Sequence, residues 1–227
     1  MTSRQIFLTG GSGFIGQALA AELLRRGHHV RALARAGSEH RIPAGCQIVR
    51  GDALDSRSYA SEIAPAETFV HLVGVTHPGP SKGEEFRAID LQSIRQAVPA
   101  AVQAGVRHCI YLSVARPAPI MHEYQAVRAE GENLIVQAEL NATFVRPWYV
   151  LGPGRRWPVA LIPMYAIARM IPATRDGAIR LALVTLEQMV QSLVWAVENP
   201  ADGIRALEPP QIRRAGNLDL VMSPHAA

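Results

Sequence analysis

Cysteine is scarce in this sequence of 227 residues, which contains only Cys46 and Cys109. Two cysteines cannot build the disulfide framework typical of small secreted domains. The first residues, Met-Thr-Ser-Arg-Gln-Ile-Phe-Leu, lack the long apolar run of a secretory signal. We therefore expect a cytoplasmic protein. At roughly 150 residues per domain, the length predicts one compact domain with an appendage.

Lysine is almost absent: Lys82 is the only lysine among the 23 basic side chains, and the other 22 are arginines. Lys82 lies among Gly and Pro in an expected loop, which argues against mechanisms that need a lysine amine as nucleophile. The formal net charge of +4 is spread along the chain, with no basic tract longer than an arginine pair. This dispersion argues against a nucleic-acid partner.

Metal-ligand spacing and long apolar runs are also missing. No two histidines have the i, i+4 spacing of a helical zinc site, so we expect no metal. The apolar segment 157–171 is interrupted by Pro158, Pro163 and Arg169, which argues against a transmembrane segment. The sequence Arg155-Arg156-Trp157 ahead of it leaves a peripheral membrane contact open. The sequence does not specify an oligomeric state.

Short apolar runs alternate with segments of helical period, a pattern that predicts an α/β fold with a Rossmann-type, doubly wound parallel sheet. The expected strands are Gln5–Thr9, His29–Ala34, Cys46–Arg50, Thr68–Val73, His108–Ser113 and Thr143–Arg146. The expected helices are Phe14–Arg26, Glu84–Gln103 and Leu186–Glu198, the second kinked or divided at Pro99. We expect a dinucleotide-binding domain over 1–150, a small helical lid appendage over 151–214 and a flexible tail over 215–227.

A glycine-rich loop joins the first expected strand to the first expected helix, with the sequence Thr9-Gly10-Gly11-Ser12-Gly13-Phe14-Ile15-Gly16. Gly10 permits a tight turn, Gly13 lets the backbone approach a pyrophosphate, and Gly16 lets the helix pack closely on the sheet. The amides at the helix start would then meet the anion. The strand, loop and helix order predicts a dinucleotide cofactor, although a glycine-rich turn without ligand has the same local pattern.

The end of the second expected strand indicates which dinucleotide is bound. Arg35 occupies the region where a site selective for NAD usually carries Asp or Glu. Arg31 and Arg35 offer guanidinium donors that suit a 2′-phosphate, so we predict NADP rather than NAD. Alternatively, Arg35 simply solvates a strand end.

Several motifs together resemble the short-chain dehydrogenase/reductase superfamily over about residues 4–154. They are the glycine loop, Gly51-Asp52, Tyr111-Leu112-Ser113, Tyr124 with Arg128, and Arg146-Pro147 followed by Gly152-Pro153-Gly154. Within the superfamily the chain looks like the atypical and extended branches, including NAD(P)H-binding proteins of the nitrogen-metabolite-repressor type. The resemblance implies that Ser12, Phe14 and Ile15 line the pyrophosphate, Asp52 and Ala53 meet the adenine, Val73 and Gly74 flank its ribose, and Pro147 lies beside the nicotinamide. Asp52 is also a common turn former after a strand.

The resemblance further implies a catalytic set with one departure. In the superfamily a serine orients the carbonyl, a tyrosine transfers the proton, and a lysine four residues later lowers the tyrosine pKa. Ser113 and Tyr124 match the first two, but Arg128 stands at the third. The i, i+4 spacing still places Arg128 beside Tyr124, where it could reach the ribose. Arginine is larger and is not deprotonated, so turnover stays open.

Three functions remain open on these residues. The first is an NADP-dependent oxidoreductase that reduces a small apolar carbonyl or quinone with Tyr124 as proton donor. The second is a non-catalytic NADP(H)-binding regulator or assembly factor, and the third is a protein whose appendage rests on a membrane surface. The residues that could make the pocket apolar are Trp148, Tyr149, Trp157, Ile162, Met164, Tyr165 and Met170, although core or interface packing explains them equally well. An epimerase or dehydratase acting on a nucleotide sugar is disfavoured by the short C-terminal region.

Overall fold

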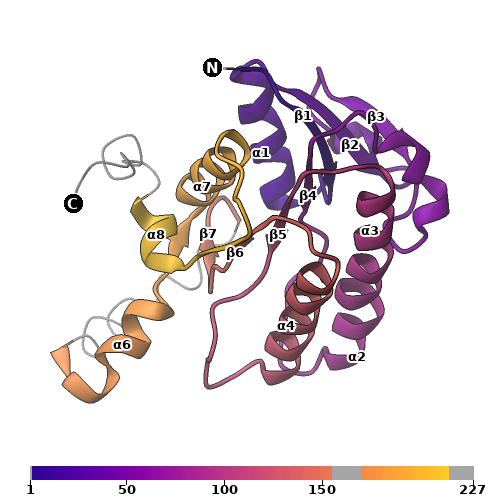
Figure 1. Ribbon diagram of the computed structural model, residues 1–227. Helices are drawn as coiled ribbons and strands as arrows, with labels where there is room; N and C mark the ends of the chain where they lie inside the picture. Colours follow the sequence, from indigo (N-terminus) through magenta and orange to yellow (C-terminus); the bar gives the residue numbers. More distant parts are fainter. Residues whose placement is uncertain (1, 155–169, 215–227) are drawn as a thin grey trace.

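A seven-stranded parallel sheet forms the centre of the molecule in the computed structural model, which describes residues 2–154 and 170–214 (Figure 1). The strand order is β3-β2-β1-β4-β5-β6-β9, and each neighbouring pair is parallel. The strands are β1 Gln5–Thr9, β2 His29–Ala34, β3 Gln47–Arg50, β4 Thr68–His71, β5 His108–Leu112, β6 Ala142–Val145 and β9 Ile204–Leu207. The predicted α/β doubly wound fold is confirmed.

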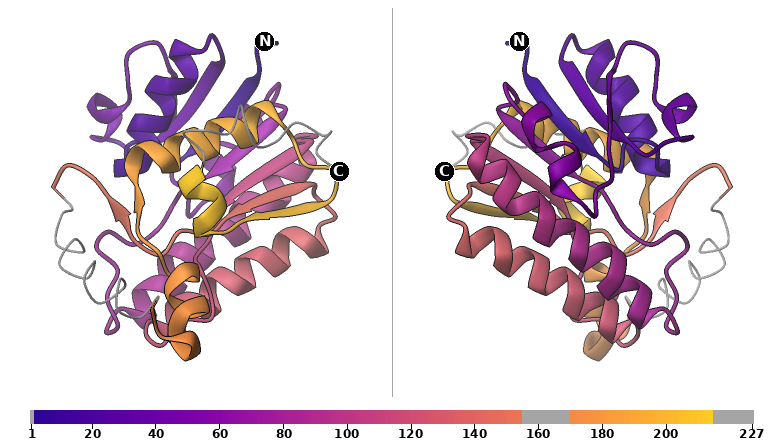
Figure 2. Two further views of the ribbon diagram at one scale, coloured as in Figure 1. Left: turned by 90° about the vertical axis from the view of Figure 1, so that its left-hand side faces the viewer. Right: turned by 90° about the vertical axis from the view of Figure 1, so that its right-hand side faces the viewer.

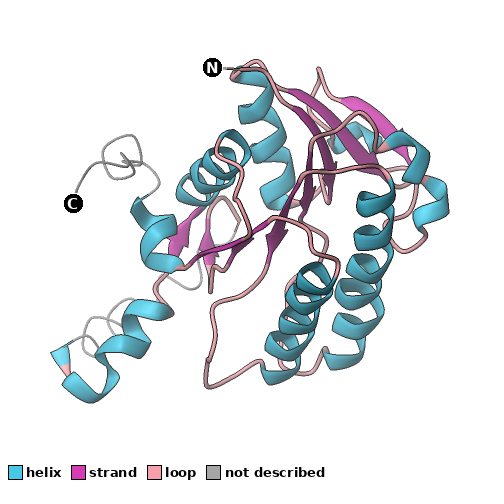
Figure 3. Cartoon of the chain, in the orientation of Figure 1, coloured by secondary structure: helices cyan, strands magenta, loops and turns pink. Residues whose placement is uncertain are grey.

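Helices cover both faces of this sheet (Figures 2 and 3). On one face α1 and α7 share a hydrophobic cluster with Ile6, Leu8 and Val70. On the other face α3 and α4 pack with Phe7, Phe69 and Tyr111. The longer helices are α1 Phe14–Arg25, α3 Gln92–Gln103, α4 His122–Gln137, α6 Pro172–Arg180 and α7 Leu186–Glu198. The smaller elements are α2 Gly83–Glu85, α8 Pro209–Arg214, the strand pair β7 Val150–Leu151 with β8 Val184–Thr185, and 3-10 turns at Glu39–Arg41, Ser56–Ser58 and Ala60–Glu62.

Local sequence explains where α1 and α7 begin and end. The first helix ends at Arg25, and Gly27 then adopts a φ of 82°, a left-handed conformation that glycine tolerates well. The N-terminus of α7 is a capping box, in which the Thr185 side chain accepts from the Gln188 amide and the Gln188 side chain accepts from the Thr185 amide. The predicted bounds of α7 agree with the structure.

The segment predicted as a helix over Glu84–Gln103 differs from expectation in where it is interrupted. It is not divided at Pro99, which is exposed and lies inside α3. A proline here removes one hydrogen bond on the solvent side, where water can satisfy the free carbonyl. The irregularity lies earlier, in a π-helical turn over Phe86–Leu91.

The C-terminal region contributes a strand that the sequence did not reveal. Ile204–Leu207 pairs with β6 at the edge of the sheet, and the strand is short, partly exposed and interrupted by Arg205. Elements on both sides of residue 150 share one core, because Met189 and Leu193 of α7 pack in the same cluster as Leu19 of α1. The apolar segment from Trp157 to Arg169 and the tail 215–227 lie outside the described residues.

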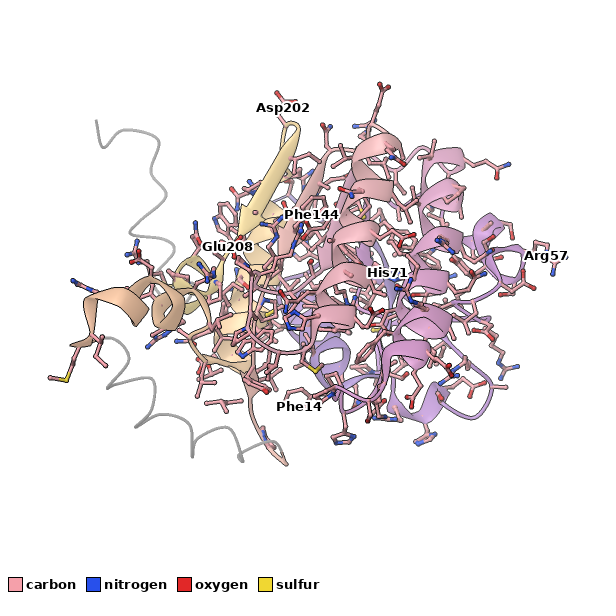
Figure 4. All side chains as sticks on the ribbon, turned by 90° about the horizontal axis from the view of Figure 1, so that it is seen from below. Phe14, Arg57, His71, Phe144, Asp202 and Glu208 are labelled. Carbon is pink, nitrogen blue, oxygen red and sulfur yellow. The ribbon has the colours of Figure 1, made fainter. Side chains whose placement is uncertain are left out.

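The strand order creates a point where the chain reverses its direction of winding. From β1, the strands β2 and β3 are added toward one edge of the sheet, while β4, β5, β6 and β9 are added toward the other edge. The order therefore reverses between β1 and β4. Doubly wound sheets bind ligands in the crevice at the carboxyl ends of the strands at this point. Phe14, just after β1, lies at the edge of the molecule opposite Asp202, which precedes β9 (Figure 4). Within 2–154 and 170–214 no helix is long and apolar enough to cross a membrane.

Candidate cofactor and substrate site

A pocket of about 300 Å³ lies at the carboxyl ends of β1, β4, β5 and β6. Loops that follow these four strands supply most of its lining, the first turn of α1 adds three residues, and α4 adds Tyr124 and Arg128. The predicted site residues that line it are Gly10, Gly13, Phe14, Ile15, Gly74, Ser113, Tyr124, Arg128 and Pro147. The fold thus gathers into one cavity residues that are spread over more than half of the chain.

The glycine loop is shaped by close backbone approach. Gly10 has a φ of 76°, and a Cβ there would lie 2.8 Å from the carbonyl carbon of Leu72. A Cβ on Gly16 would overlap the Gly10 carbonyl oxygen and lie 2.8 Å from Gly11 Cα. The N-cap residue Gly13 makes no side-chain hydrogen bond to the first turn of α1, and the start of a helix is a favourable place for an anion. This geometry fits the diphosphate of a dinucleotide.

Five other predicted cofactor residues do not line the pocket. Among the described residues the lining does not include Ser12, Val73, Arg35, Asp52 or Ala53. The Ser12 carbonyl accepts a hydrogen bond from the Gln17 side chain at 2.9 Å, and the Val73 carbonyl accepts one from Arg128 at 3.2 Å. Their roles toward a cofactor stay predictions.

The two arginines expected near a 2′-phosphate differ in their surroundings. The Arg31 guanidinium donates to the Gln47 side chain at 3.0 Å and to the backbone carbonyls of Glu62 and Ala64. Arg35 is exposed, and no hydrogen bond or ion pair holds its side chain within the part of the chain that the structure describes. Arg35 is therefore the better placed of the two to meet a ligand. Asp52, after β3, accepts a hydrogen bond from the Leu54 amide at 3.0 Å, as a turn former would.

Tyr124 and Ser113 line the same pocket as the glycine loop. Ser113 follows β5 and is buried, while Tyr124 lies in the first turns of α4 and is half-buried. The Tyr124 ring packs against Phe86, with ring centroids 4.9 Å apart. Burial raises the pKa of Tyr124 above its usual value, the positive charge of Arg128 opposes that rise, and the negative charge of Asp90 adds to it.

Arg128 is 2% exposed, and its donors are directed into the protein. Nη1 donates to the Leu112 carbonyl at 2.8 Å, and Nη2 forms an ion pair of 2.6 Å with Asp90. The guanidinium carbon lies 5.1 Å from the centre of the Tyr124 ring. Arg128 thus stands beside the tyrosine, as its i, i+4 spacing predicted, while its charge is paired inside the protein.

Asp90 is a residue of this site that sequence reasoning missed. It is fully buried in the π-helical turn, and its second carboxylate oxygen accepts from the Val75 amide at 2.9 Å. The available signal was its position, since Asp90 follows Phe86 and precedes Ile94 by four residues on the apolar face of the expected helix. A carboxylate on the buried face of a helix needs an oppositely charged or hydrogen-bonding partner.

A second buried acid, Glu132, organises the end of β6 beside the pocket. Arg146 donates to both of its carboxylate oxygens, at 2.8 and 2.6 Å, and Arg116 also pairs with it. Burial opposes ionisation of Glu132, but the hydrogen bonds it accepts and the positive charges of Arg146 and Arg116 together outweigh that effect and lower its pKa. Arg146 also reaches Glu208 at 2.8 Å, which ties α4 to the segment after β9. The network holds Pro147 and the residues after it at the pocket.

The expected apolar lining is partly present. Trp148 and Tyr149 line the pocket, whereas Met170 is 84% exposed and does not. Trp157, Ile162, Met164 and Tyr165 lie outside the described residues. Over the two described ranges, no group of three or more His, Cys, Asp or Glu side chains could hold a metal ion.

Comparisons with known proteins agree with this geometry. The model of an NAD(P)H-binding family matches residues 10–156. The chain is 28% identical to a ceramide reductase of Caulobacter vibrioides over 213 residues, which are 93% of this chain and 66% of that protein. It is 32% identical to a 3-beta-hydroxysteroid dehydrogenase of Mycolicibacterium neoaurum over 115 residues, which are 47% of this chain and 31% of that protein. The chain thus spans less than two thirds of these relatives.

Solved structures show the same fold at low identity. The Bordetella bronchiseptica enzyme WbmH in complex with NAD+ superposes with a TM-score of 0.69 at 18% identity, covering 91% of this chain and 76% of that one. A UDP-galactose 4-epimerase gives a TM-score of 0.69 at 20% identity, covering 89% and 76% of the two chains. The family match covers more than half of the chain, and the sheet topology agrees with it. The chain therefore belongs to the NAD(P)H-binding family, an atypical branch of the short-chain dehydrogenases/reductases.

Proposed function

We propose that this protein is an NADP-dependent oxidoreductase that reduces a small apolar carbonyl or quinone with Tyr124 as proton donor. The observation that carries the proposal is that one pocket joins the glycine loop to Ser113 and Tyr124. The reductase and dehydrogenase names of its relatives support the reaction class.

The residues of the pocket divide the chemistry between them. A bound nicotinamide nucleotide supplies the hydride. The backbone of Gly10–Gly16 binds the diphosphate, and the Ser113 hydroxyl orients the substrate carbonyl. Because the pKa of Tyr124 lies above its usual value, its phenol is protonated at neutral pH and suits an acid in the direction of reduction.

The substrate end of the pocket favours an apolar molecule. Trp148, Tyr149, Val75 and Pro78 line it, and none of them carries a charge. We propose that residues 151–214 cap this end; within that range the lining includes Gly154, of the residues that the structure describes. We place the reaction in the cytoplasm because the chain has too few cysteines for a disulfide framework.

Selection of NADP over NAD would rest on Arg35. It lies at the end of β2 with an exposed side chain, and a guanidinium matches a phosphate in charge and geometry. Together with Tyr124, it defines the two ends of the proposed active site.

A turnover measurement tests the proposal. NADPH oxidation is measured with a panel of apolar ketones and quinones for wild type and Tyr124→Phe. We expect the variant to lose about 100-fold in kcat with an unchanged Kd for NADPH, because the phenol acts only in proton transfer. A rate equal to that of wild type would refute the role of Tyr124.

A second candidate is a non-catalytic NADP(H)-binding regulator or assembly factor. One observation favours it: the charge of Arg128 is already paired with Asp90 and is not free to activate the phenol. Tight NADPH binding without turnover on any substrate of the panel would support this function instead.

A further inference from the structure

We propose that Asp90 is a positioning residue of this site, which fixes Arg128 at the ends of β4 and β5 and cancels its charge beside the Tyr124 phenol. The inference rests on the proposed function for its meaning in catalysis. The positions of Asp90 and Arg128 and the pairing of their charges are argued from the contacts of the buried pair alone.

Three backbone groups hold the pair in place. Arg128 donates to the Leu112 carbonyl at the end of β5, to the Val73 carbonyl after β4 and to Asp90. Asp90 in turn accepts from the Val75 amide. Because every one of these partners is backbone or a buried carboxylate, the guanidinium has one position, and it joins two strand ends to the π-helical turn.

The glycine at position 74 matches this pair. A Cβ there would overlap Nη2 of Arg128 and lie 3.1 Å from Oδ1 of Asp90. Gly74 and Val75 line the pocket, so the pair shapes the wall that faces the ligand. The lack of a side chain at Gly74 therefore leaves the space in which Arg128 and Asp90 form their ion pair.

The π-helical turn is what brings the carboxylate into reach. Ser93, one turn further along, donates to the Asp90 carbonyl at 2.9 Å and contacts the buried His71 ring at 3.1 Å. Asp90 itself is 0% exposed, so its charge is not screened by water. A π-helical turn inside a helix often marks a functional position, and here it turns an acid toward the tyrosine helix.

The electrostatic consequence falls on Tyr124. The groups that act on its phenol are Arg128 on the same helix, Asp90 from the π-helical turn and Tyr111 from β5. Ser113 and His77 lie in the lining of the same pocket. Arg128 and Asp90 form the ion pair of 2.6 Å beside the phenol, and their charges are opposite. The phenol therefore faces a neutral pair, where an unpaired cation would stabilise phenolate.

The test is a spectroscopic titration that needs no turnover. Phenolate absorbance is followed with pH in wild type and Asp90→Asn, and the same titration of each protein carrying Tyr124→Phe is subtracted to isolate Tyr124. Asparagine keeps the shape of the side chain and removes its charge. We expect the Tyr124 midpoint to fall by about one pH unit or more, because one positive charge is left beside the phenol.

A second comparison covers the case in which Asp90→Asn fails to fold. Arg128→Lys is compared with Arg128→Lys/Asp90→Asn, in which the remaining cation is smaller and easier to accommodate. The same downward shift is expected between these two proteins. Midpoints that agree within about 0.3 pH unit in each comparison that folds would overturn the proposal.

Measuring NADPH affinity distinguishes a role of the Asp90 charge from a role of the Asp90 side chain in bracing the pocket wall. If Asp90 only braced the wall at Gly74 and Val75, Asp90→Asn would weaken NADPH binding and leave the Tyr124 midpoint in place. That outcome contradicts the proposal. Because the titration does not depend on catalysis, a shifted midpoint in a protein that turns over no substrate would uphold the role of Asp90 and refute only the proposed oxidoreductase.

Discussion

The two ends of the pocket are built in different ways. The end around Gly10–Gly16 is made of backbone, and its shape comes from glycines whose missing Cβ atoms leave room for close approach. The end around Tyr124 is made of side chains, and its shape comes from the buried pair of Asp90 with Arg128. The first depends on one stretch of sequence, whereas the second depends on residues 38 positions apart.

This difference determines how each end tolerates change. A backbone site is lost when a side chain intrudes, but it has few other ways to fail. A side-chain site holds charges without water, so removing one partner leaves the other charge uncompensated. Substitutions at the two ends should therefore damage different properties: ligand affinity at the glycine loop, and stability together with proton transfer at Tyr124.

The largest effect is expected for Asp90→Ala, which leaves the Arg128 guanidinium buried without its acid. We expect the free energy of unfolding to fall by about 3–5 kcal/mol, measured by urea denaturation. The exposed pair of Arg87 with Glu123 is the matched control, and Glu123→Ala should cost less than about 1 kcal/mol. Equal losses for the two variants would show that the buried pair contributes no more than a surface one.

The next effect tests the opposite end of the pocket. In Gly16→Ala the new Cβ meets the Gly10 carbonyl, so the loop must move away from its phosphate-binding shape. We expect NADPH binding to weaken by about 100-fold, measured by fluorescence titration. Gly177→Ala in α6 serves as control, because a Cβ there would meet no neighbouring group within 4 Å among the residues that the structure describes. Retained affinity in Gly16→Ala would contradict a cradle made of backbone.

The same contrast explains what the sequence could predict. Strands β1 and β2 and helix α7 have the predicted bounds, and the other predicted strands differ by a residue or two, because apolar periodicity is a local property. The glycine loop was also predictable, since its residues are adjacent. The bounds of these elements and the glycine loop can both be predicted without knowing which distant residues are in contact.

The side-chain end could be predicted only in part. Tyr124 and Arg128 are four residues apart, so their proximity follows from the helix alone. The partner Asp90 lies on another helix, and its approach depends on a π-helical turn that no periodicity indicated. Strand β9 was missed for a related reason: four residues with little burial form a strand only because β6 offers a free edge.

A smaller effect concerns His71, which lies between the two ends. Its ring contacts Thr9 of β1 at 2.8 Å and Ser93 of α3 at 3.1 Å, and burial lowers its pKa to about 3. Unfolded histidine binds a proton near pH 6.5, while the folded ring does not until about pH 3. Acidification across this window therefore favours the unfolded state, by up to about 1.4 kcal/mol per pH unit.

The measurement is the free energy of unfolding of wild type and His71→Gln between pH 7 and pH 5. We expect the variant to lose less stability on acidification than wild type, although it is less stable at pH 7. If His71→Gln keeps the slope of wild type, the ring is protonated in the folded protein and does not link the two ends in its neutral form.

The smallest effect is expected for Arg35, which lies beyond the backbone end and has an exposed side chain. Arg35→Ala should raise the Kd for NADPH by about fivefold to tenfold and leave the Kd for NADH unchanged, because a solvated guanidinium adds one charge-assisted contact to a phosphate. Arg31→Ala is the matched control, since its guanidinium is engaged by Gln47 and two backbone carbonyls. A loss confined to Arg31→Ala, or tighter binding of NADH than of NADPH by wild type, would remove Arg35 from the site. Either result would leave the proposed role of the glycine loop unchanged, because NAD and NADP carry the same diphosphate.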